Sequence, residues 1–241
     1  MSIAPQVSIA ENLEQINQRI QRACDRVQRS PSEVTLMAVS KNQPPERVAE
    51  GVDLGLTLFG ENRIQEAKSK IPLCPGSIRW HLIGHLQSNK CRDAVQLFDM
   101  IQSVDSIRLA TELQQAAEKA SRTIQILVEV NVAGEASKFG WNPDQILADL
   151  PALNGLHRLE IHGLMTLAPY TKDPEGARPF FRKLRILRDS CAQKLGTPLP
   201  VLSMGMSGDF EIAIEEGSNL VRIGTALFGT RPSLIRRDDA I

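Results

Sequence analysis

Short apolar segments rich in β-branched residues alternate along the chain with longer amphipathic segments. The first amphipathic segment carries apolar residues at intervals of four and three positions, the period of one face of a helix: Ile9, Leu13, Ile16, Ile20, Ala23 and Val27. The apolar run at residues 34–40 that follows has the length and composition of a strand. The pattern therefore predicts an opening helix, followed by strands and helices in turn.

The alternation continues as far as residue 223. The pattern predicts strands at residues 34–40, 57–59, 79–83, 100–104, 124–131, 158–165, 201–204 and 220–223. It predicts helices at residues 44–54, 63–70, 89–98, 106–120, 143–150, 174–195 and 210–216, with a short helical tail after the last strand. Strictly alternating units of this kind form a parallel sheet with right-handed crossovers.

Eight strand–helix units in 241 residues fit a closed barrel. We expect an α/β fold, a single (β/α)8 TIM-type barrel with an extra N-terminal helix. An open doubly wound sheet is the alternative. No linker or low-complexity stretch divides the chain, so we expect one domain over residues 1–229 and a C-terminal tail over residues 230–241.

Composition and charge exclude several classes of protein. The 28 Lys and Arg residues balance 28 Asp and Glu residues, so the chain has no basic excess for general nucleic-acid binding. The longest apolar runs fall far short of the ~18 residues of a membrane helix, and the first residues lack the blocks of a signal peptide. The four cysteines form no C-x-x-C pair, which indicates neither a disulfide framework nor a cysteine zinc site. We expect a soluble, cytoplasmic protein that does not bind membranes.

The residues that follow the predicted strands are unusually rich in chemistry. In barrels of this type the active site lies where strands end and the loops to the helices begin. Glycines, amides, hydroxyls or charges follow nearly every strand, among them Lys41, Asn62, His85, Ser103, Asn131, Thr166, Ser207 and Thr225. Any one of these would suit an ordinary surface turn. Their concentration at one rim indicates a site there.

Two neighbouring loops have the features of a phosphate-binding site. Residues 206–209 open a helix, where backbone N–H groups lack acceptors and the helix dipole favours an anion. Ser207 adds a hydroxyl donor, and Gly208 lets the backbone approach an anion closely. Gly224 and Thr225 repeat these features after the last strand, and the loops after strands seven and eight often bind phosphate in barrels. The alternative is that these residues are only helix caps and turn glycines.

Lys41 is the second candidate group. It follows an apolar strand, so its amine should lie in the barrel mouth, where lost hydration lowers its pKa and favours imine formation. A lysine and a phosphate site inside one barrel together suggest pyridoxal phosphate (PLP), whose aldehyde forms a Schiff base with lysine. The alternatives are that Lys41 is a solvated surface lysine, or that Lys138 in the loop after the fifth strand forms the imine.

Several sequence motifs occur together in a fixed order. They are AVSKNQP (38–44), FGENRIQEAKSK (59–70), WHLIGHLQSNK (80–90), SVDS (103–106), VEVNVAGEASKFG (128–140), HGLMTLAPY (162–170), LSMGMSGDFEIAI (202–214) and VRIGTALFG (221–229). Together they resemble the pyridoxal phosphate homeostasis protein family, which is similar to the barrel half of alanine racemase and belongs to the type III group of PLP folds. The resemblance extends from the first helix to Gly229.

The resemblance implies roles for individual residues. Lys41 would carry PLP as a Schiff base, and Arg222 would contact the pyridine nitrogen. The phosphate ligands would be Ser207, Gly224 and Thr225. The remaining residues that the resemblance places around the cofactor are Asn62, His85, Ser103, Asn131, Met165 and Met206.

The same resemblance implies a protein without established catalysis, which influences vitamin B6, amino-acid and 2-oxo-acid balance. Arg222 fits this role or a racemase that avoids side reactions, because an arginine favours an unprotonated pyridine nitrogen and so a weak electron sink. Racemisation also needs a second acid or base opposite Lys41. Racemases of this fold take this second acid or base, a tyrosine, from an added β domain, for which the tail at 230–241 leaves no room. The only tyrosine in this sequence, Tyr170, follows strand six.

We therefore expect a PLP-binding homeostasis or carrier protein, a monomer, with PLP-requiring enzymes as possible recipients. A PLP-dependent amino-acid racemase or other weak PLP enzyme is the alternative. Metal-dependent hydrolysis is a third class, because His81 and His85 stand four residues apart. That spacing matches a zinc motif only on a helix, whereas these residues follow a strand pattern and no nearby carboxylate completes the ligands. We expect no metal site.

Overall fold

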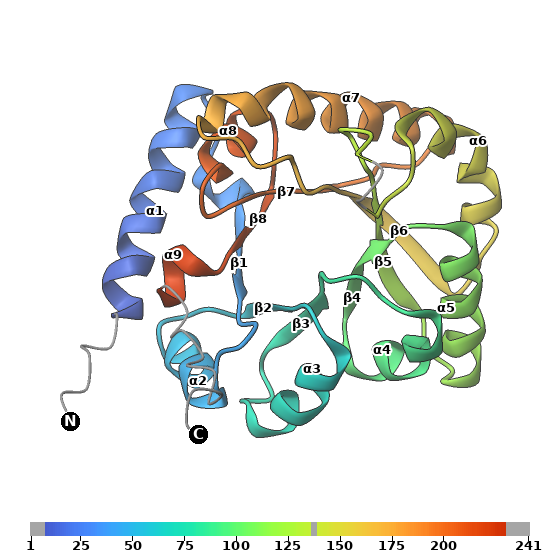
Figure 1. Ribbon diagram of the computed structural model, residues 1–241, viewed down its shortest axis with the longest axis horizontal. Helices are drawn as coiled ribbons and strands as arrows, with labels where there is room; N and C mark the ends of the chain where they lie inside the picture. The colour runs from blue at the N-terminus through green and yellow to red at the C-terminus, as the bar shows by residue number, and fades with distance from the viewer. Residues whose placement is uncertain (1–7, 136–138, 230–241) are drawn as a thin grey trace, which may run out of the picture.

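The computed structural model describes residues 8–135 and 139–229, and its strands form a closed parallel barrel. Each strand pairs with the next, and the last pairs with the first, with Ala38 opposite Ile223. In Figure 1 the helices surround this ring. The strands are β1 (Thr35–Val39), β2 (Leu58–Glu61), β3 (Arg79–Leu82), β4 (Met100–Val104), β5 (Ile124–Glu129), β6 (Leu159–Met165), β7 (Val201–Met206) and β8 (Leu220–Ile223). The closed barrel is confirmed, and the open sheet is excluded.

Several helices begin at residues suited to helix starts. Ser106 caps one of them by accepting a hydrogen bond from the N–H of Leu109, and proline opens two others. The helices are α1 (Ile9–Arg26), α2 (Pro45–Asp53), α3 (Ile64–Lys70), α4 (Cys91–Leu97), α5 (Ile107–Lys119), α6 (Pro143–Asn154), α7 (Arg178–Leu195), α8 (Phe210–Glu215) and α9 (Thr225–Phe228). Short 3-10 turns are η1 (Pro31–Glu33), η2 (Ile71–Leu73), η3 (Ser88–Lys90) and η4 (Pro174–Ala177).

Successive residues along each strand face the barrel interior and the surrounding helices in turn. Two small clusters fill the interior, one of Met37, Leu58 and Leu220 and the other of Met100, Leu127 and Met165. The strand residues between these positions, such as Ala38 and Phe59, belong to the larger core beneath the helices. Because the interior is packed, a ligand binds at a rim, and in barrels of this type it binds where the carboxyl ends of the strands meet.

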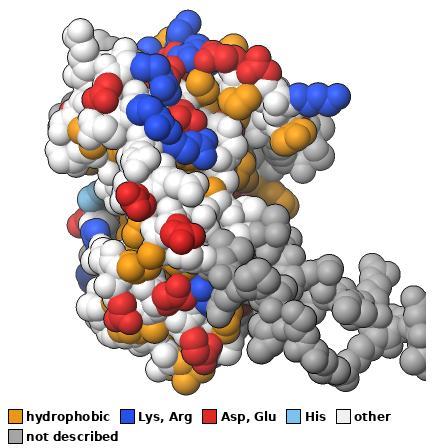
Figure 2. Space-filling view, turned by 90° about the vertical axis from the view of Figure 1, so that its left-hand side faces the viewer, with side chains coloured by type: hydrophobic (Ala, Val, Ile, Leu, Met, Phe, Trp, Pro, Cys, Tyr) orange, Lys and Arg blue, Asp and Glu red, His pale blue; other side chains and the backbone are white. Residues whose placement is uncertain are grey.

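The predicted opening helix is α1, which packs outside the barrel against α8 and α9. Its buried face consists of Ile9, Ile16, Ile20, Ala23 and Cys24. Arg19 forms an ion pair with Glu211 at 2.8 Å and lies over the ring of Phe210. Figure 2, which looks onto the left-hand side of Figure 1, shows Lys and Arg side chains beside Asp and Glu, with hydrophobic side chains in small groups.

Some element boundaries differ from the sequence predictions. The second strand extends to Glu61, because the buried Glu61 carboxylate accepts a hydrogen bond from the Lys70 amine at 2.7 Å and its charge does not end the strand. The fifth strand ends at Glu129, two residues early, where the backbone turns to pair Val130 with Trp141. The sixth helix continues past residue 150 to Asn154, and the α-helix predicted from residue 174 begins only at residue 178.

No helix in the described ranges is both long enough and apolar enough to cross a membrane.

Candidate cofactor site at the barrel mouth

Lys41 stands just beyond the carboxyl end of β1. Met37 faces the barrel interior, and alternate positions lead from it through Val39 to Lys41. Lys41 is half-buried, and the adjoining Ser40 is fully buried. The structure thus places this lysine at the mouth of the barrel, where the sequence analysis expects it.

The loop after β8 lies beside Lys41, because β8 and β1 are paired. Gly224 approaches β1 so closely that a Cβ atom at this position would lie 3.4 Å from the Val39 Cβ. Thr225 begins α9, where the first N–H groups have no acceptor within the helix. The Ala226 N–H donates to the Ser207 hydroxyl oxygen at 3.2 Å, which joins this loop to the loop after β7.

Residues 206–209 form a closed turn at the end of β7. The Met206 N–H donates to the Asp209 carboxylate at 2.6 Å, and the Asp209 N–H donates to the Met206 carbonyl at 3.1 Å. In the described part of the chain, the N–H groups of Ser207 and Gly208 donate to no protein atom. The Ser207 hydroxyl accepts from α9 and keeps its own proton to donate. The loops after β7 and β8 therefore present several hydrogen-bond donors side by side, which is the donor set that a phosphate group requires.

A chain of buried polar side chains crosses the barrel below this rim. The amide of Gln102 bonds the His81 ring at 2.9 Å, and the Ser203 hydroxyl donates to the Gln102 carbonyl oxygen at 2.7 Å. The Arg222 guanidinium donates to the Ser203 hydroxyl oxygen and to the Thr166 carbonyl, each at 2.7 Å. Burial lowers the pKa of His81 to about 3, so this ring is neutral at physiological pH. The chain fixes the direction of the Arg222 side chain.

Buried charges gather around Arg222. Burial lowers the pKa of the guanidinium to about 10, although the carboxylates of Asp209 and Glu129 oppose that shift, so Arg222 stays charged at pH 7. Burial raises the pKa of Glu129 to about 7, and the charge of Asp105 adds to this shift while Arg222 opposes it. Burial also raises the pKa of Asp209. The mouth therefore holds a permanent cation and a carboxyl group that titrates near neutrality.

His85 and Phe139 form a flat stack at the rim. Their ring centres lie 3.6 Å apart with an angle of 12° between the planes, and Phe139 is about half exposed. The His85 Nδ1 atom lies 3.3 Å from a carboxylate oxygen of Asp105. His85 is predicted from the sequence to lie at the cofactor, whereas no sequence pattern indicates Phe139, its stacking partner.

Asn62 and Ser103 lie at the ends of β2 and β4, on either side of the loop that contains Gly84. A Cβ atom at Gly84 would lie 2.2 Å from the Asn62 carbonyl oxygen, so these two loops touch through their backbones. The Ser103 hydroxyl donates to the Gly84 carbonyl at 2.7 Å. The Ser103 side chain is fully buried, and its hydroxyl holds a neighbouring loop in place.

The other residues predicted to line the cofactor differ in how deeply their side chains are buried. The Asn131 side chain closes the loop after β5 by donating to the Glu135 carbonyl at 2.8 Å and accepting its N–H at 3.2 Å. Met165 is fully buried in the floor of the barrel, and Met206 is partly exposed at the rim. Lys138, the alternative imine-forming residue, lies outside the described residues.

Three buried polar residues of the mouth were not predicted from the sequence: Gln102, Ser203 and Glu129. Each stands two positions after an interior residue of its strand, namely Met100, Val201 and Leu127. A polar residue in phase with interior apolar residues was the signal that could have identified them.

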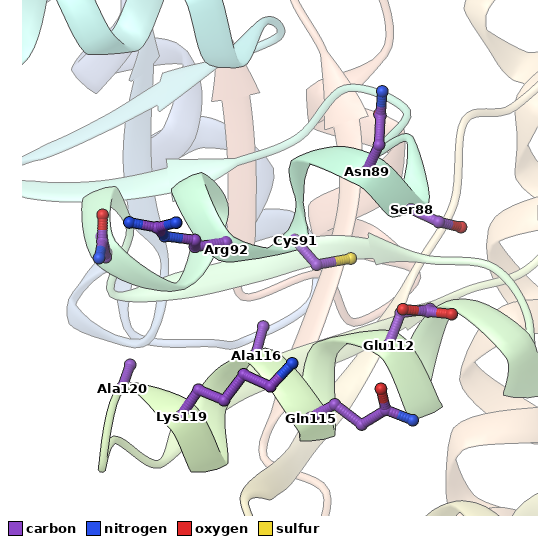
Figure 3. Close-up of a pocket in the computed structure, with 10 residues that line it drawn as sticks. Ser88, Asn89, Cys91, Arg92, Glu112, Gln115, Ala116, Lys119 and Ala120 are labelled. Atoms are coloured by element: carbon purple, nitrogen blue, oxygen red, sulfur yellow. The ribbon is translucent and has the colours of Figure 1, made fainter.

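A separate hollow of about 460 Å³ lies outside the barrel between α4 and α5 (Figure 3). Burial raises the pKa of its Cys91 thiol to about 11, with a contribution from Glu112, so this thiol stays protonated. None of the predicted site residues line this hollow, which makes it distinct from the mouth. Among the described residues, no group of three His, Cys, Asp or Glu side chains is placed to hold a metal ion.

Comparison with known proteins identifies the family. The model of the alanine racemase N-terminal domain matches residues 12–232. The pyridoxal phosphate homeostasis protein of Aquifex aeolicus (strain VF5) is 42% identical over 226 residues, which cover 93% of this chain and 99% of that protein. Its counterpart in Escherichia coli (strain K12) is 37% identical over 232 residues, covering 92% and 97%. The chain belongs to the pyridoxal phosphate homeostasis protein family.

Solved structures agree with this family assignment. PipY of Synechococcus elongatus PCC7942 is 37% identical, and the match covers 92% of this chain and 100% of PipY. The TM-score is 0.83 to PipY without PLP and 0.81 to PipY with PLP bound. Alanine racemase of Clostridium difficile 630, at 17% identity and a TM-score of 0.70, shares the fold alone, and the match covers 59% of its length. The resemblance inferred from the motifs is confirmed.

Proposed function

We propose that this protein binds PLP at the barrel mouth through an imine with Lys41 and serves PLP homeostasis. One observation carries the proposal: Lys41 lies at the end of β1, beside the paired donor loops after β7 and β8. In forming the imine, the lysine nitrogen bonds to the aldehyde carbon of PLP and the aldehyde oxygen leaves as water. A related protein, PipY, has been solved with PLP bound, which supports the choice of cofactor.

The residues present fit this cofactor. The N–H groups of Ser207, Gly208 and Thr225, with the Ser207 hydroxyl, would hold the phosphate group. Arg222 would donate a hydrogen bond to the pyridine nitrogen, since it is held by Ser203 and Thr166 and remains charged. Bound PLP supplies an electron-accepting ring, and an arginine at its nitrogen keeps that ring a weak acceptor.

The electrostatics of the mouth favour holding PLP over reacting with amino acids. Beside the Arg222 end of the site stand the carboxyl groups of Glu129 and Asp209. In their charged forms they would repel the carboxylate of an incoming amino acid. We propose on these grounds that the protein has no enzymatic function of its own.

We further propose that the protein acts in the cytoplasm as a monomer and supplies PLP to PLP-requiring enzymes. Its family supports the homeostasis role. Exposed large hydrophobic side chains in the described ranges are scattered over several elements, for example Leu73, Tyr170 and Ile186, which supports a monomer. Light scattering of the purified protein would test the oligomeric state.

The visible spectrum of the purified protein tests the central proposal. With PLP added, the protein should develop the near-visible band of a protonated imine. Reduction with borohydride should then fix the cofactor on the peptide that contains Lys41. A protein that stays colourless and retains no PLP on a desalting column would disprove cofactor binding.

Ser207→Ala should weaken PLP binding without moving the absorption band. The substitution removes one charge-assisted hydrogen bond to the phosphate, worth roughly 1.5–3 kcal/mol, so affinity should fall about ten- to a hundredfold. The remaining imine at Lys41 keeps its surroundings, and its band should keep its position. Titration with PLP followed by absorbance measures both. An unchanged affinity would show that the phosphate lies elsewhere.

A PLP-dependent racemase is the second candidate, and Glu129 is the observation in its favour. Its buried carboxyl group titrates near pH 7 at the mouth, which is the property of a general acid or base. We expect no enzyme-like racemisation of amino acids by the wild type, measured by chiral chromatography. If the wild type racemises an amino acid and both Lys41→Ala and Glu129→Gln stop the reaction, the racemase interpretation replaces the carrier proposal.

A further inference from the structure

A buried cluster of charged side chains lies directly behind Lys41, outside the strand ring. The Lys70 ammonium donates three hydrogen bonds, each 2.7 Å long, to the Ser40 carbonyl and to the carboxylates of Glu61 and Glu66. The Ser40 hydroxyl donates to the same Glu61 oxygen at 2.7 Å. We call Ser40, Glu61, Glu66 and Lys70 the Lys70 cluster. All three protons of the ammonium group are therefore engaged.

The Lys70 cluster holds the two peptide groups that flank Lys41. On one side, the Ser40 carbonyl accepts from the Lys70 ammonium. On the other side, the Asn42 N–H donates to the Glu66 carboxylate at 2.5 Å. Lys41 itself lies in a turn closed by the hydrogen bond from the Gln43 N–H to the Ser40 carbonyl at 2.9 Å. The backbone on both sides of Lys41 is thus fixed to side chains of α3.

The turn at Lys41 uses a backbone conformation that needs support. Asn42 has φ of 60°, the left-handed region that non-glycine residues seldom adopt, although asparagine tolerates it better than most. The carboxylate of Glu66 bonds this residue's own N–H. The bond therefore supports the turn that contains Lys41.

Stability alone does not account for the Lys70 cluster. Glu61 is fully buried and Lys70 is 5% exposed, and burying charges in this way costs more than burying apolar side chains of similar size. One carboxylate oxygen of Glu61 has no hydrogen-bond partner in the described part of the chain. Burial raises the pKa of Glu61 even though Lys70 opposes the shift. Such a cluster contributes a defined geometry more than it contributes stability.

We propose that Glu66 and Lys70 are positioning residues for Lys41, which hold its backbone so that its amine meets the aldehyde of PLP. The inference rests on the proposed function, because it assumes an imine at Lys41. Neither residue touches the cofactor in this proposal. Their effect should therefore depend entirely on the presence of Lys41.

A double-mutant cycle tests this dependence. Lys70→Met is made in the wild type and in Lys41→Ala, and PLP binding is measured by absorbance of the imine and, without the imine, by equilibrium dialysis. With Lys41 present, Lys70→Met should lower the apparent affinity for imine formation at least about tenfold. In the Lys41→Ala background, it should change the affinity for PLP by less than about twofold. An equal loss in both backgrounds would mean a general disturbance of the mouth and would overturn the proposal.

A readout without PLP strengthens the test. Amide hydrogen exchange of residues 40–43 in the cofactor-free protein should accelerate in Lys70→Met and in Glu66→Ala, because each removes a bond to a flanking peptide group. Unchanged exchange in both variants would overturn the proposal. The matched control is Lys68→Met, which also removes a lysine from α3. The Lys68 side chain is 63% exposed and pairs with Asp93. This control should leave exchange and imine formation unchanged.

Glu66→Ala also serves if Lys70→Met does not fold. Glu66 is the least buried charged member of the cluster, so its loss leaves the Lys70–Glu61 pair intact. It should lower imine formation in the presence of Lys41 about tenfold and leave PLP binding in Lys41→Ala unchanged. Normal imine formation in Glu66→Ala would reject its positioning role. If Lys41→Ala itself retains the imine band, the proposed function fails first, and the two failures are distinguishable.

Discussion

Replacing Lys41 with alanine should abolish the near-visible absorption band that PLP gives with the wild type. The band requires an amine held against the aldehyde of PLP. Lys41 supplies that amine at the end of β1, beside the donor loops after β7 and β8. PLP should still bind, with lower affinity, through Ser207 and Arg222. Absorbance after addition of PLP, together with equilibrium dialysis, separates the lost band from the retained binding.

The folding of the Lys41→Ala variant should be nearly unchanged, because a half-buried lysine contributes little apolar burial. Lys68→Ala is the control for removing a lysine, and it should keep the full band, since its side chain is exposed on α3. A full band in Lys41→Ala would mean that another lysine forms the imine. Lys138 would then be the first candidate, and Lys138→Ala the next variant to measure.

Glu129→Gln should stabilise the cofactor-free protein at alkaline pH. Burial, together with the charge of Asp105, raises the pKa of this carboxyl group from 4.5 to about 7. A raised folded-state pKa means that the folded protein holds the proton more tightly than the unfolded chain. The Glu129 carboxyl group therefore does not lower the free energy of unfolding below about pH 4.5, and it lowers this free energy increasingly until the pH passes about 7. Above that pH the cost reaches about 3 kcal/mol.

The measurement is the free energy of unfolding by urea at two pH values. Near pH 5 the wild type and Glu129→Gln should differ little, whereas near pH 8 the variant should be more stable by about 3 kcal/mol. Glu160→Gln is a suitable control, because Glu160 lies on the neighbouring strand β6 with an exposed side chain. Equal stability differences at both pH values would show that Glu129 is not a buried titrating group.

Most of the fold can be predicted from the sequence because the barrel repeats one pattern. Each strand–helix unit carries its own apolar run and amphipathic segment, and the closure of eight units follows from their number. The rim residues Lys41, Ser207 and Thr225 were placed correctly at strand ends because their positions depend only on where each strand stops. Their roles toward PLP stay predictions that the experiments above test.

The parts that sequence analysis missed depend on contacts between distant units. Gln102 and Ser203 belong to different strands, and only the closed ring brings their side chains to 2.7 Å. Glu61 ends β2 instead of following it because Lys70, nine positions later on α3, supplies the opposite charge. A local pattern of apolar and polar residues does not indicate such distant partners.

The pairing of β1 with β8 has a consequence for synthesis of the protein. Lys41 is among the first residues of the barrel to leave the ribosome, whereas Gly224 and Thr225 are among the last. A nascent chain that ends before β8 would hold the lysine without the loop that completes its surroundings. Retention of PLP on a desalting column would therefore report ring closure directly, and chains halted before residue 220 should lose the cofactor on that column however long they are incubated with PLP.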